Sequence, residues 1–300
     1  MGTENENLPG FVTITPPSNN GGAQNYGAAF LPASFQATPI GSRDRDLGTE
    51  AVAYLRRSQT IDGQRRELDL LQAYNRAQMA ARGQGSAAFQ PEIEGLIESF
   101  ELGFRMQAEM PQVLNLDAES AATHRLYGID DSTTEAFGRK CLLARRLVEA
   151  GVRFIEVTHG NWDQHFNLRT ALENNCRSVD GPVAGLLEDL DQRGLLAETL
   201  VVWSGEFGRT PHAQGGDGRD HNHTAFSCWM AGGGIKPGMR YGESDEYGYE
   251  VASNPVTIHD WHATMLHLLG LDHTRLTYRY AGRDFRLTDV YGRVIHDIVA

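Results

Sequence analysis

Carboxylate, imidazole and guanidinium side chains gather in three short segments of this chain. The segments are His159-Gly-Asn-Trp-Asp-Gln-His165, Glu206-Phe-Gly-Arg-Thr-Pro211 and Arg219-Asp-His-Asn-His223. Carboxylate oxygens and imidazole nitrogens bind zinc and similar ions, and arginine pairs well with oxyanions. Loops that leave the carboxyl ends of neighbouring strands in an α/β protein converge on one crevice, so these segments are expected to meet there. The sequence therefore predicts a metal-assisted active site.

The first and third segments contain candidate metal ligands. Asp163 and His165 are separated by Gln164 alone, so in an extended chain both side chains face the same side and could bind one ion. His221 is a candidate third ligand and is favoured over His223. Zinc fits this mixture of imidazole and carboxylate best, with calcium, magnesium and manganese as alternatives.

Glu206 and Arg209 are the candidate catalytic residues. Glu206 comes soon after the apolar run Thr199–Trp203, which places its carboxylate at the mouth of the predicted sheet as a general base or a metal ligand. Arg209 and Arg219 are candidate clamps for a substrate oxyanion. The alternative is structural, because Glu206 and Arg209 could simply form a surface ion pair.

The composition describes a globular chain with an acidic balance. It has 300 residues, of which 40% are hydrophobic, and a net charge of −12 at pH 7. Nucleic acids and anionic membranes are bound by clustered basic side chains, so this balance predicts no nucleic-acid and no membrane partner. Lys140 and Lys236 are the only lysines, so arginine carries almost all the positive charge. The expected partner is a small-molecule or carbohydrate ester, and the oligomeric state is left open.

Cysteine content and hydropathy exclude several classes of protein. Cys141, Cys176 and Cys228 cannot form a complete disulfide framework, so we expect free thiols. The sequence contains no apolar run of about 18 residues, and its first residues lack the basic and apolar regions of an export signal. The chain itself therefore leaves its localisation open.

The elements that position these segments are expected to form one α/β domain over residues 1–300. Residues 1–50 should be mostly irregular, residues 51–130 a helical insert, and residues 131–300 the α/β core. Helices are expected over residues 64–82, 91–110, 132–150, 179–192 and 259–269, and strands over residues 10–15, 152–157, 199–203 and 224–231. The pattern Ser132-Thr-Thr-Glu135 predicts a capping box at the start of the third helix. Alternating helices and strands in the core predict a mainly parallel sheet flanked by helices. The glycine-rich stretch Gln214–Arg219 is expected to be a loop that orders around a ligand or partner.

Several stretches carry a family resemblance. They are Glu4-Asn-Glu-Asn-Leu-Pro-Gly-Phe11, Asn161-Trp-Asp-Gln-His165, Gly205-Glu-Phe-Gly-Arg-Thr-Pro211, Gly218-Arg-Asp-His221, Ala231-Gly-Gly-Gly-Ile-Lys236, Asp260–Gly270 and Tyr278–Val290. Together they resemble the bacterial family labelled domain of unknown function 1501, a branch of the alkaline phosphatase and sulfatase-like superfamily. The resemblance covers nearly the whole chain.

The resemblance implies an alkaline-phosphatase-like α/β fold. By that analogy Asp163, His165, Glu206 and His221 stand where the superfamily holds its divalent metals. Glu206-Phe207 departs from the Asp-His pair that the superfamily usually has there. Family members usually begin with an export signal, a first apolar strand and a Gly-Gly-Pro-Ser-His-like turn, and look periplasmic or secreted. This chain is therefore expected to be a truncated member that lacks the N-terminal strand.

Three functions remain open. The leading one is a metal-dependent hydrolase of sulfate or phosphate esters, in which metal and arginine stabilise negative charge. The superfamily takes its nucleophile from the expected missing region, and Ser204 and Thr158 are the nearest hydroxyls here. The second is a noncatalytic or fragmentary family member that acts as a binding or scaffold protein. The third is a metal-independent carbohydrate-binding module, for which alanine at Asp163 or Glu206 would leave ligand binding intact.

Overall fold

The structure is a computed structural model, and it describes residues 3, 5–17, 22–29, 31–42, 47–48, 50–52, 55–57, 59–82 and 90–300. Parts of the expected irregular segment and of the expected helical insert lie outside these residues. The chain divides into two compact units, one formed by Met1–Gly160 with Ser178–Leu186 and the other by Asn161–Arg177 with Leu187–Ala300. The expected single domain over residues 1–300 stays a prediction.

The first unit contains a parallel three-stranded sheet with the strand order β2-β1-β3. Its strands are β1 (Phe11–Ile14), β2 (Thr38–Ile40) and β3 (Phe154–Val157). Ile14 lies opposite Ile40 on one side and Val157 on the other. Val12 and Ile14 on one face of β1 and Thr13 on the other are each 0% exposed, which fits a central parallel strand covered on both faces. The predicted strands over residues 10–15 and 152–157 are confirmed, and β2 is an addition.

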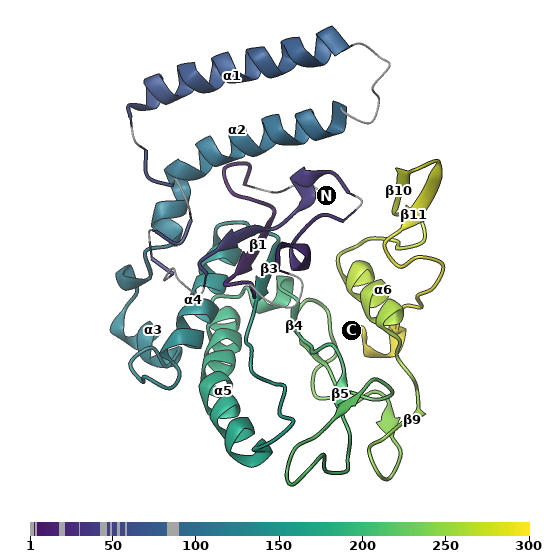
Figure 1. Ribbon diagram of the computed structural model, residues 1–300. Helices are drawn as coiled ribbons and strands as arrows, with labels where there is room; N and C mark the ends of the chain where they lie inside the picture. Colours follow the sequence, from purple (N-terminus) through teal and green to yellow (C-terminus); the bar gives the residue numbers. More distant parts are fainter. Residues whose placement is uncertain are drawn as a thin grey trace. The chain divides into compact units, whose positions relative to one another are not determined.

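The described part of the first unit also contains helices. They are α1 (Ile61–Arg82), α2 (Gln90–Val113), α3 (Ala121–Leu126) and α4 (Glu135–Glu149), joined by part of α5 (Leu168–Gln192). Figure 1 shows α1 and α2 side by side as a hairpin. α4 contacts β3 and buries Leu142, Leu143 and Leu147, each 0% exposed. The predicted helices over residues 64–82, 91–110 and 132–150 are confirmed, and α3 was not predicted.

Two helix starts differ from the prediction. The Ser132-Thr-Thr-Glu135 pattern predicted a capping box, but the N-cap of α4 is Thr134 and its side chain makes no capping hydrogen bond. Instead, Asp131 Oδ1 accepts a hydrogen bond from the Thr133 N–H and holds these residues in a turn. α5 begins at Leu168, whereas the prediction placed its start near Val179. The prediction missed the first turns because they are mostly exposed and lack the apolar periodicity that marks the rest of the helix.

The second unit contains four two-stranded antiparallel sheets. The pairs are β4 (Val201–Trp203) with β7 (Trp229–Ala231), β5 (Gly208–Arg209) with β6 (His221–Asn222), β8 (Glu243–Ser244) with β9 (Val251–Ser253), and β10 (Thr277–Tyr280) with β11 (Arg283–Arg286). The α/β class is confirmed, but the prediction of a mainly parallel sheet is wrong for this unit. β4 was expected to extend that sheet, yet the chain from β4 to β7 forms a loop with a small hairpin instead of the crossover helix that parallel strands need.

One further helix, α6 (Ile258–Leu268), anchors the C-terminal segment of the second unit. Thr257 and Asp260 form a capping box at its start, and Asp260 Oδ1 also accepts a hydrogen bond of 2.7 Å from the Arg293 N–H. Short 3₁₀ helices lie at Gly22–Asn25, Ala33–Phe35, Leu116–Ala118, Leu196–Glu198 and His296–Ile298. None of the described helices is both long enough and apolar enough to cross a membrane. Cys141, Cys176 and Cys228 are free thiols, as expected.

Candidate metal centre

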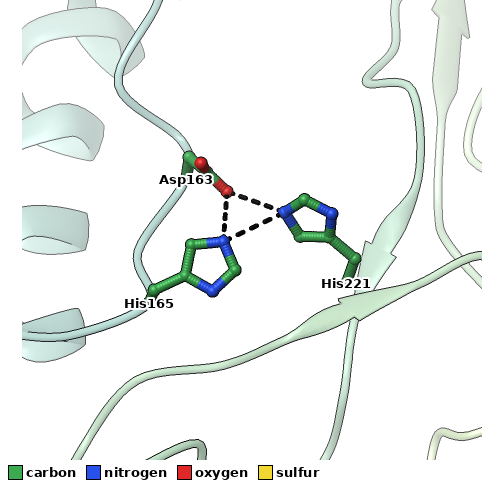
Figure 2. Close-up of side chains that lie close together, drawn as sticks. All are labelled: Asp163, His165 and His221. Carbon is green, nitrogen blue, oxygen red and sulfur yellow. Dashed lines mark hydrogen bonds and ion pairs between the residues drawn. The ribbon is translucent and has the colours of Figure 1, made fainter.

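Three candidate ligands converge in the second unit (Figure 2). Asp163 Oδ1 lies 3.0 Å from His165 Nε2 and 2.9 Å from His221 Nε2. The two Nε2 atoms are themselves 3.1 Å apart. Asp163, His165 and His221 are the group of potential ligands found among the described residues, each offering one atom within 4.8 Å of the others. The tertiary structure therefore brings together three of the four residues that the sequence suggested as metal ligands.

The segment before α5 aims Asp163 and His165 in the same direction. Asn161 and Asn167 bracket it in left-handed conformations, with φ of 68° and 55°. Between them, the His165 N–H donates to the Asp163 carbonyl and closes a tight turn. The buried Gln164 side chain points inward and donates to the Asn161 carbonyl. The prediction that Asp163 and His165 face the same side is confirmed, although the chain turns here instead of running extended.

The β5–β6 hairpin supplies His221 and a supporting guanidinium. Arg209 and His221 are direct partners across the ladder, so their side chains lie on the same face. Arg209 Nη2 donates to Asp163 Oδ1 at 2.7 Å and to the Trp162 carbonyl at 3.0 Å. The Phe207 ring packs against the His221 ring, with 4.2 Å between the two ring centroids. One strand pair thus holds two of the three partners of the Asp163 carboxylate.

Tryptophan side chains support the ligand segment from β4 and β7. Trp203 and Trp229 are cross-strand partners, and their rings stack 6.1 Å apart. Trp162 packs edge-on against Trp203 at 6.2 Å. Because Trp162 directly precedes Asp163, this contact attaches the ligand segment to the β4–β7 pair. Aromatic pairs of this geometry contribute about 0.5–1.5 kcal/mol beyond their burial.

The electrostatics favour an ionised carboxylate at the cluster. The hydrogen bond from Arg209, followed by that from His221, lowers the pKa of Asp163 to about 2. Its side chain is 64% exposed and that of His221 is 46% exposed, so the cluster is open to solvent. The Asp163 carboxylate is therefore ionised, and both it and His221 are accessible to solvent.

The residues present fit a tetrahedral metal. Zinc ligands about 2.1 Å from the ion lie about 3.4 Å apart, which is close to the 2.9–3.1 Å separations seen here. His165 Nδ1 lies 2.6 Å from Gln214 Oε1, which can only accept a hydrogen bond. A neutral His165 that donates from Nδ1 to this oxygen turns its Nε2 lone pair towards Asp163 Oδ1. Two lone pairs this close repel each other unless a cation or a proton lies between them, so the donor set suits a cation.

Glu206 lies outside the cluster. Its side chain is exposed, and within the described part of the chain it forms no hydrogen bond or ion pair. The alternative of a surface pair between Glu206 and Arg209 is wrong, because Arg209 pairs with Asp163. Arg219, the other candidate clamp, donates to the Gly218 carbonyl at 2.8 Å.

Ser204, the candidate hydroxyl in the second unit, forms no hydrogen bond with the cluster. Ser204 Oγ donates to the Gly205 carbonyl and lies 3.1 Å from Cys228 Sγ. Thr158 and His159 belong to the first unit, where Lys140 Nζ donates to the Thr158 carbonyl at 2.8 Å and His159 Nε2 lies 3.1 Å from Ser178 Oγ.

Sequence reasoning missed Gln214 and the tryptophan support. Gln214 lies in the glycine-rich stretch expected to be a loop, and nothing in its local sequence distinguishes it from a solvent-facing glutamine. The apolar strand Val201–Trp203 was visible, but its antiparallel pairing with Trp229 was not.

Comparisons with known proteins identify a family and nothing closer. No protein of established function and no solved structure matches the chain. The model of one family, described as protein of unknown function (DUF1501), matches residues 1–299. The family expected from the sequence stretches is confirmed, and the chain belongs to the DUF1501 family.

Proposed function

We propose that this protein is a metal-dependent hydrolase of sulfate or phosphate esters, with Asp163, His165 and His221 as the ligands of a divalent ion. The observation that carries the proposal is the convergence of these three ligand atoms within 4.8 Å on an exposed surface of the second unit. Zinc suits two imidazoles and one carboxylate better than calcium or magnesium, which prefer more oxygen ligands.

The number of ligands supports a catalytic rather than a structural site. Catalytic zinc sites commonly have three protein ligands and keep one position open, whereas structural sites are closed by four. A bound divalent ion would act there as a Lewis acid that polarises an ester oxygen and stabilises charge on the leaving oxygen. The exposed side chains of Asp163 and His221 leave room for an ester to approach.

Arg209 and Glu206 have separate roles in this proposal. The Arg209 guanidinium is engaged with Asp163 and Trp162, so it orients the carboxylate ligand and keeps it ionised. Glu206 is proposed as a general base, because its exposed carboxylate is free to take a proton and is not a member of the ligand cluster. A role for Glu206 as a metal ligand, which the resemblance implies, is not part of the proposal.

We also propose that the chain belongs to the sulfatase-like branch of the alkaline phosphatase superfamily. The family sequence stretches, the small parallel sheet and the Asp163, His165 and His221 cluster support this placement.

One observation favours the alternative of a noncatalytic binding or scaffold protein. Among the described residues, no serine or threonine hydroxyl forms a hydrogen bond with Asp163, His165 or His221. A protein of this kind would keep the metal and bind an ester or a partner without turning it over. Hydrolysis and metal binding therefore need separate measurements.

The test begins with the metal content of purified protein, measured by plasma mass spectrometry. The parent should contain about one metal per chain, and Asp163→Ala and His221→Ala should lose it. His223→Ala is the matched control, because His223 is also exposed and lies two positions from His221 but outside the cluster. Circular dichroism of each variant should show that the fold is retained.

Ester hydrolysis is then measured with p-nitrophenyl phosphate and p-nitrophenyl sulfate. Activity that is lost with the metal supports the hydrolase. Stoichiometric metal without turnover of either ester supports the scaffold protein. A parent that binds no added zinc, manganese, magnesium or calcium overturns the metal centre and the hydrolase, and leaves the noncatalytic or fragmentary protein as the better account.

A further inference from the structure

The loop between β5 and β6 is closed on itself next to the cluster. The Gln214 N–H donates to the Gly218 carbonyl at 2.9 Å, and the Gly218 N–H donates back to the Gln214 carbonyl at 3.1 Å. The Thr210 N–H also donates to the Asp220 carbonyl at 2.9 Å, which extends the ladder beyond Arg209. Residues 214–218, which the sequence presented as a glycine-rich loop, thus form a defined turn.

This turn lies directly on the ligand segment. A Cβ atom added to Gly218 would lie 1.7 Å from the His165 carbonyl oxygen, so only glycine allows this approach. The Arg219 N–H donates to the Gln164 carbonyl at 3.0 Å, and Asp217 Oδ1 accepts the Asn167 N–H at 2.8 Å. The turn is therefore fastened to residues on both sides of His165.

The turn places one side chain against the His165 ring. Gln214 Oε1 lies 2.6 Å from His165 Nδ1, on the opposite edge of the ring from Nε2. We infer that Gln214 is a positioning residue that fixes His165 as the Nδ1–H tautomer and aims its Nε2 lone pair at the point shared with Asp163 and His221. This inference rests on the proposed function, because it assigns His165 Nε2 as a metal ligand.

The competing tautomer shows why an acceptor is needed at this position. Asp163 Oδ1 lies 3.0 Å from His165 Nε2 and would attract a proton to that nitrogen. A proton on Nε2 would block the atom that must bind the metal, since a ligating imidazole nitrogen has to be deprotonated. Gln214 opposes this by accepting the hydrogen bond from Nδ1–H. Partners of this kind typically change metal affinity by about 10-fold to 100-fold when they are removed.

The first experiment uses the metal-free full chain. Long-range ¹H–¹⁵N correlation NMR at alkaline pH distinguishes the two neutral tautomers, and a His165→Asn variant assigns the signal. In the parent, the proton of His165 should be on Nδ1. In Gln214→Leu, which keeps the volume and removes the acceptor, the proton should move to Nε2, whereas Gln214→Glu should keep it on Nδ1.

A variant in the turn tests whether the Gln214 hydrogen bond, and not the attachment of the turn to the ligand segment, sets the His165 tautomer. Asp217→Ala removes the bond to the Asn167 N–H without touching the imidazole, so the His165 proton should stay on Nδ1. A parent with the proton on Nε2, or a Gln214→Leu variant with the parent tautomer, would overturn the inference. The same would follow if Asp217→Ala shifted the proton as Gln214→Leu does.

Zinc affinity gives the second readout, measured by competition with a chromophoric chelator. Gln214→Leu should bind zinc about 10-fold to 100-fold more weakly than the parent, and Gln214→Glu should retain the parent affinity. Equal affinity in the parent and Gln214→Leu contradicts a positioning role. If the parent binds no zinc at all, the proposed function fails, whereas the tautomer measurement still decides whether Gln214 orients His165.

Discussion

At the scale of single residues, the cluster depends on the Asp163 carboxylate, which interacts with one guanidinium and two imidazoles. Asp163 Oδ1 accepts from Arg209 Nη2 at 2.7 Å and lies within 3.0 Å of both imidazole Nε2 atoms. Positive and polar neighbours stabilise the ionised form of an acid, which is why its pKa is low despite an exposed side chain. The carboxylate stays charged at every pH where the imidazoles could bind a metal.

Removing the guanidinium should change the titration of this carboxylate. In Arg209→Met, the pKa of Asp163 should rise from about 2 towards the ordinary value of about 3.9, because the largest cause of the shift is the hydrogen bond from Arg209. Carboxyl ¹³C NMR of metal-free protein measures the change. Arg219→Met is the control, since its guanidinium bonds to the Gly218 carbonyl, and it should leave the Asp163 titration in place.

Glu206 and Asp163 should respond differently to neutralisation. Asp163→Asn removes a charged ligand atom and should weaken zinc binding at least about 10-fold, whereas Glu206→Gln should keep the parent affinity, because Glu206 lies outside the cluster. If Glu206 is the general base, its variant should instead lower the rate of ester hydrolysis by about 100-fold or more. Loss of zinc from Glu206→Gln would show that it is a ligand after all.

At the scale of elements, two segments of backbone can approach each other closely where the residue at the contact is glycine. Gly138 of α4 lies against the turn after α3, and a Cβ atom there would be 2.2 Å from the Tyr127 carbonyl oxygen. Gly218 makes the corresponding contact in the second unit, against His165. In both places the neighbour is backbone, which cannot rotate away as a side chain can.

A pair of glycine substitutions tests this in the first unit. Gly138→Ala should lower the free energy of unfolding by about 1–3 kcal/mol through overpacking. Gly103→Ala in α2 is the matched control, because nothing lies within 4 Å of a Cβ atom at that position. It should raise the free energy of unfolding by about 0.5–1 kcal/mol through a better helix propensity. Urea unfolding measures both, and equal effects would contradict the close contact.

At the scale of the whole molecule, buried charges make the stability of each described unit depend on pH. In the first unit, Arg145 is 1% exposed and pairs with Glu119 at 2.9 Å and with Glu149. Burial by itself raises the pKa of Glu119, but its ion pairs with Arg146 and Arg145 outweigh this and leave the pKa below its usual range. In the second unit, burial likewise raises the pKa of Asp260, and hydrogen bonds from Thr257 and Arg293 lower it below its usual range.

These depressed pKa values predict lower stability in acid. A carboxylate with a folded pKa below its unfolded value of about 4.3 stabilises the fold fully above that pH and loses the contribution as the pH falls through the folded pKa. Glu119→Gln should therefore lower the free energy of unfolding by about 2–4 kcal/mol at pH 7, and the difference should shrink at about pH 3. Urea unfolding at the two pH values measures it.

An exposed ion pair supplies the control for this prediction. Glu173 pairs with Arg177 in α5, where the two side chains are 55% and 68% exposed. Glu173→Gln should change the free energy of unfolding by less than about 1 kcal/mol at either pH, because solvent screens the pair. A pH-independent effect of Glu119→Gln would show that its charge does not contribute.

Much of the fold followed from local sequence patterns. The helices predicted from apolar spacing are all present, and the short strand Phe11–Ile14 was visible between proline-rich stretches. The start of α5 was placed too late because exposed turns carry no apolar signal. The capping box at Ser132 was wrong because a turn around Asp131 took its place, and the mainly parallel sheet was wrong because β4 pairs with β7.

By itself the sequence determined which side chains could bind a metal, because residue type is a local property. It also predicted that Asp163 and His165 would point the same way, although the structure achieves this with a turn and not with an extended chain. It did not determine which of the distant residues would join them. Only the tertiary structure decided that His221 enters the cluster, that Arg209 pairs with Asp163 and not with Glu206, and that Gln214 meets His165. These contacts depend on the register of the β5–β6 hairpin and on how its turn lies on the ligand segment. Register depends on pairing between residues far apart in the chain, which local periodicity does not encode.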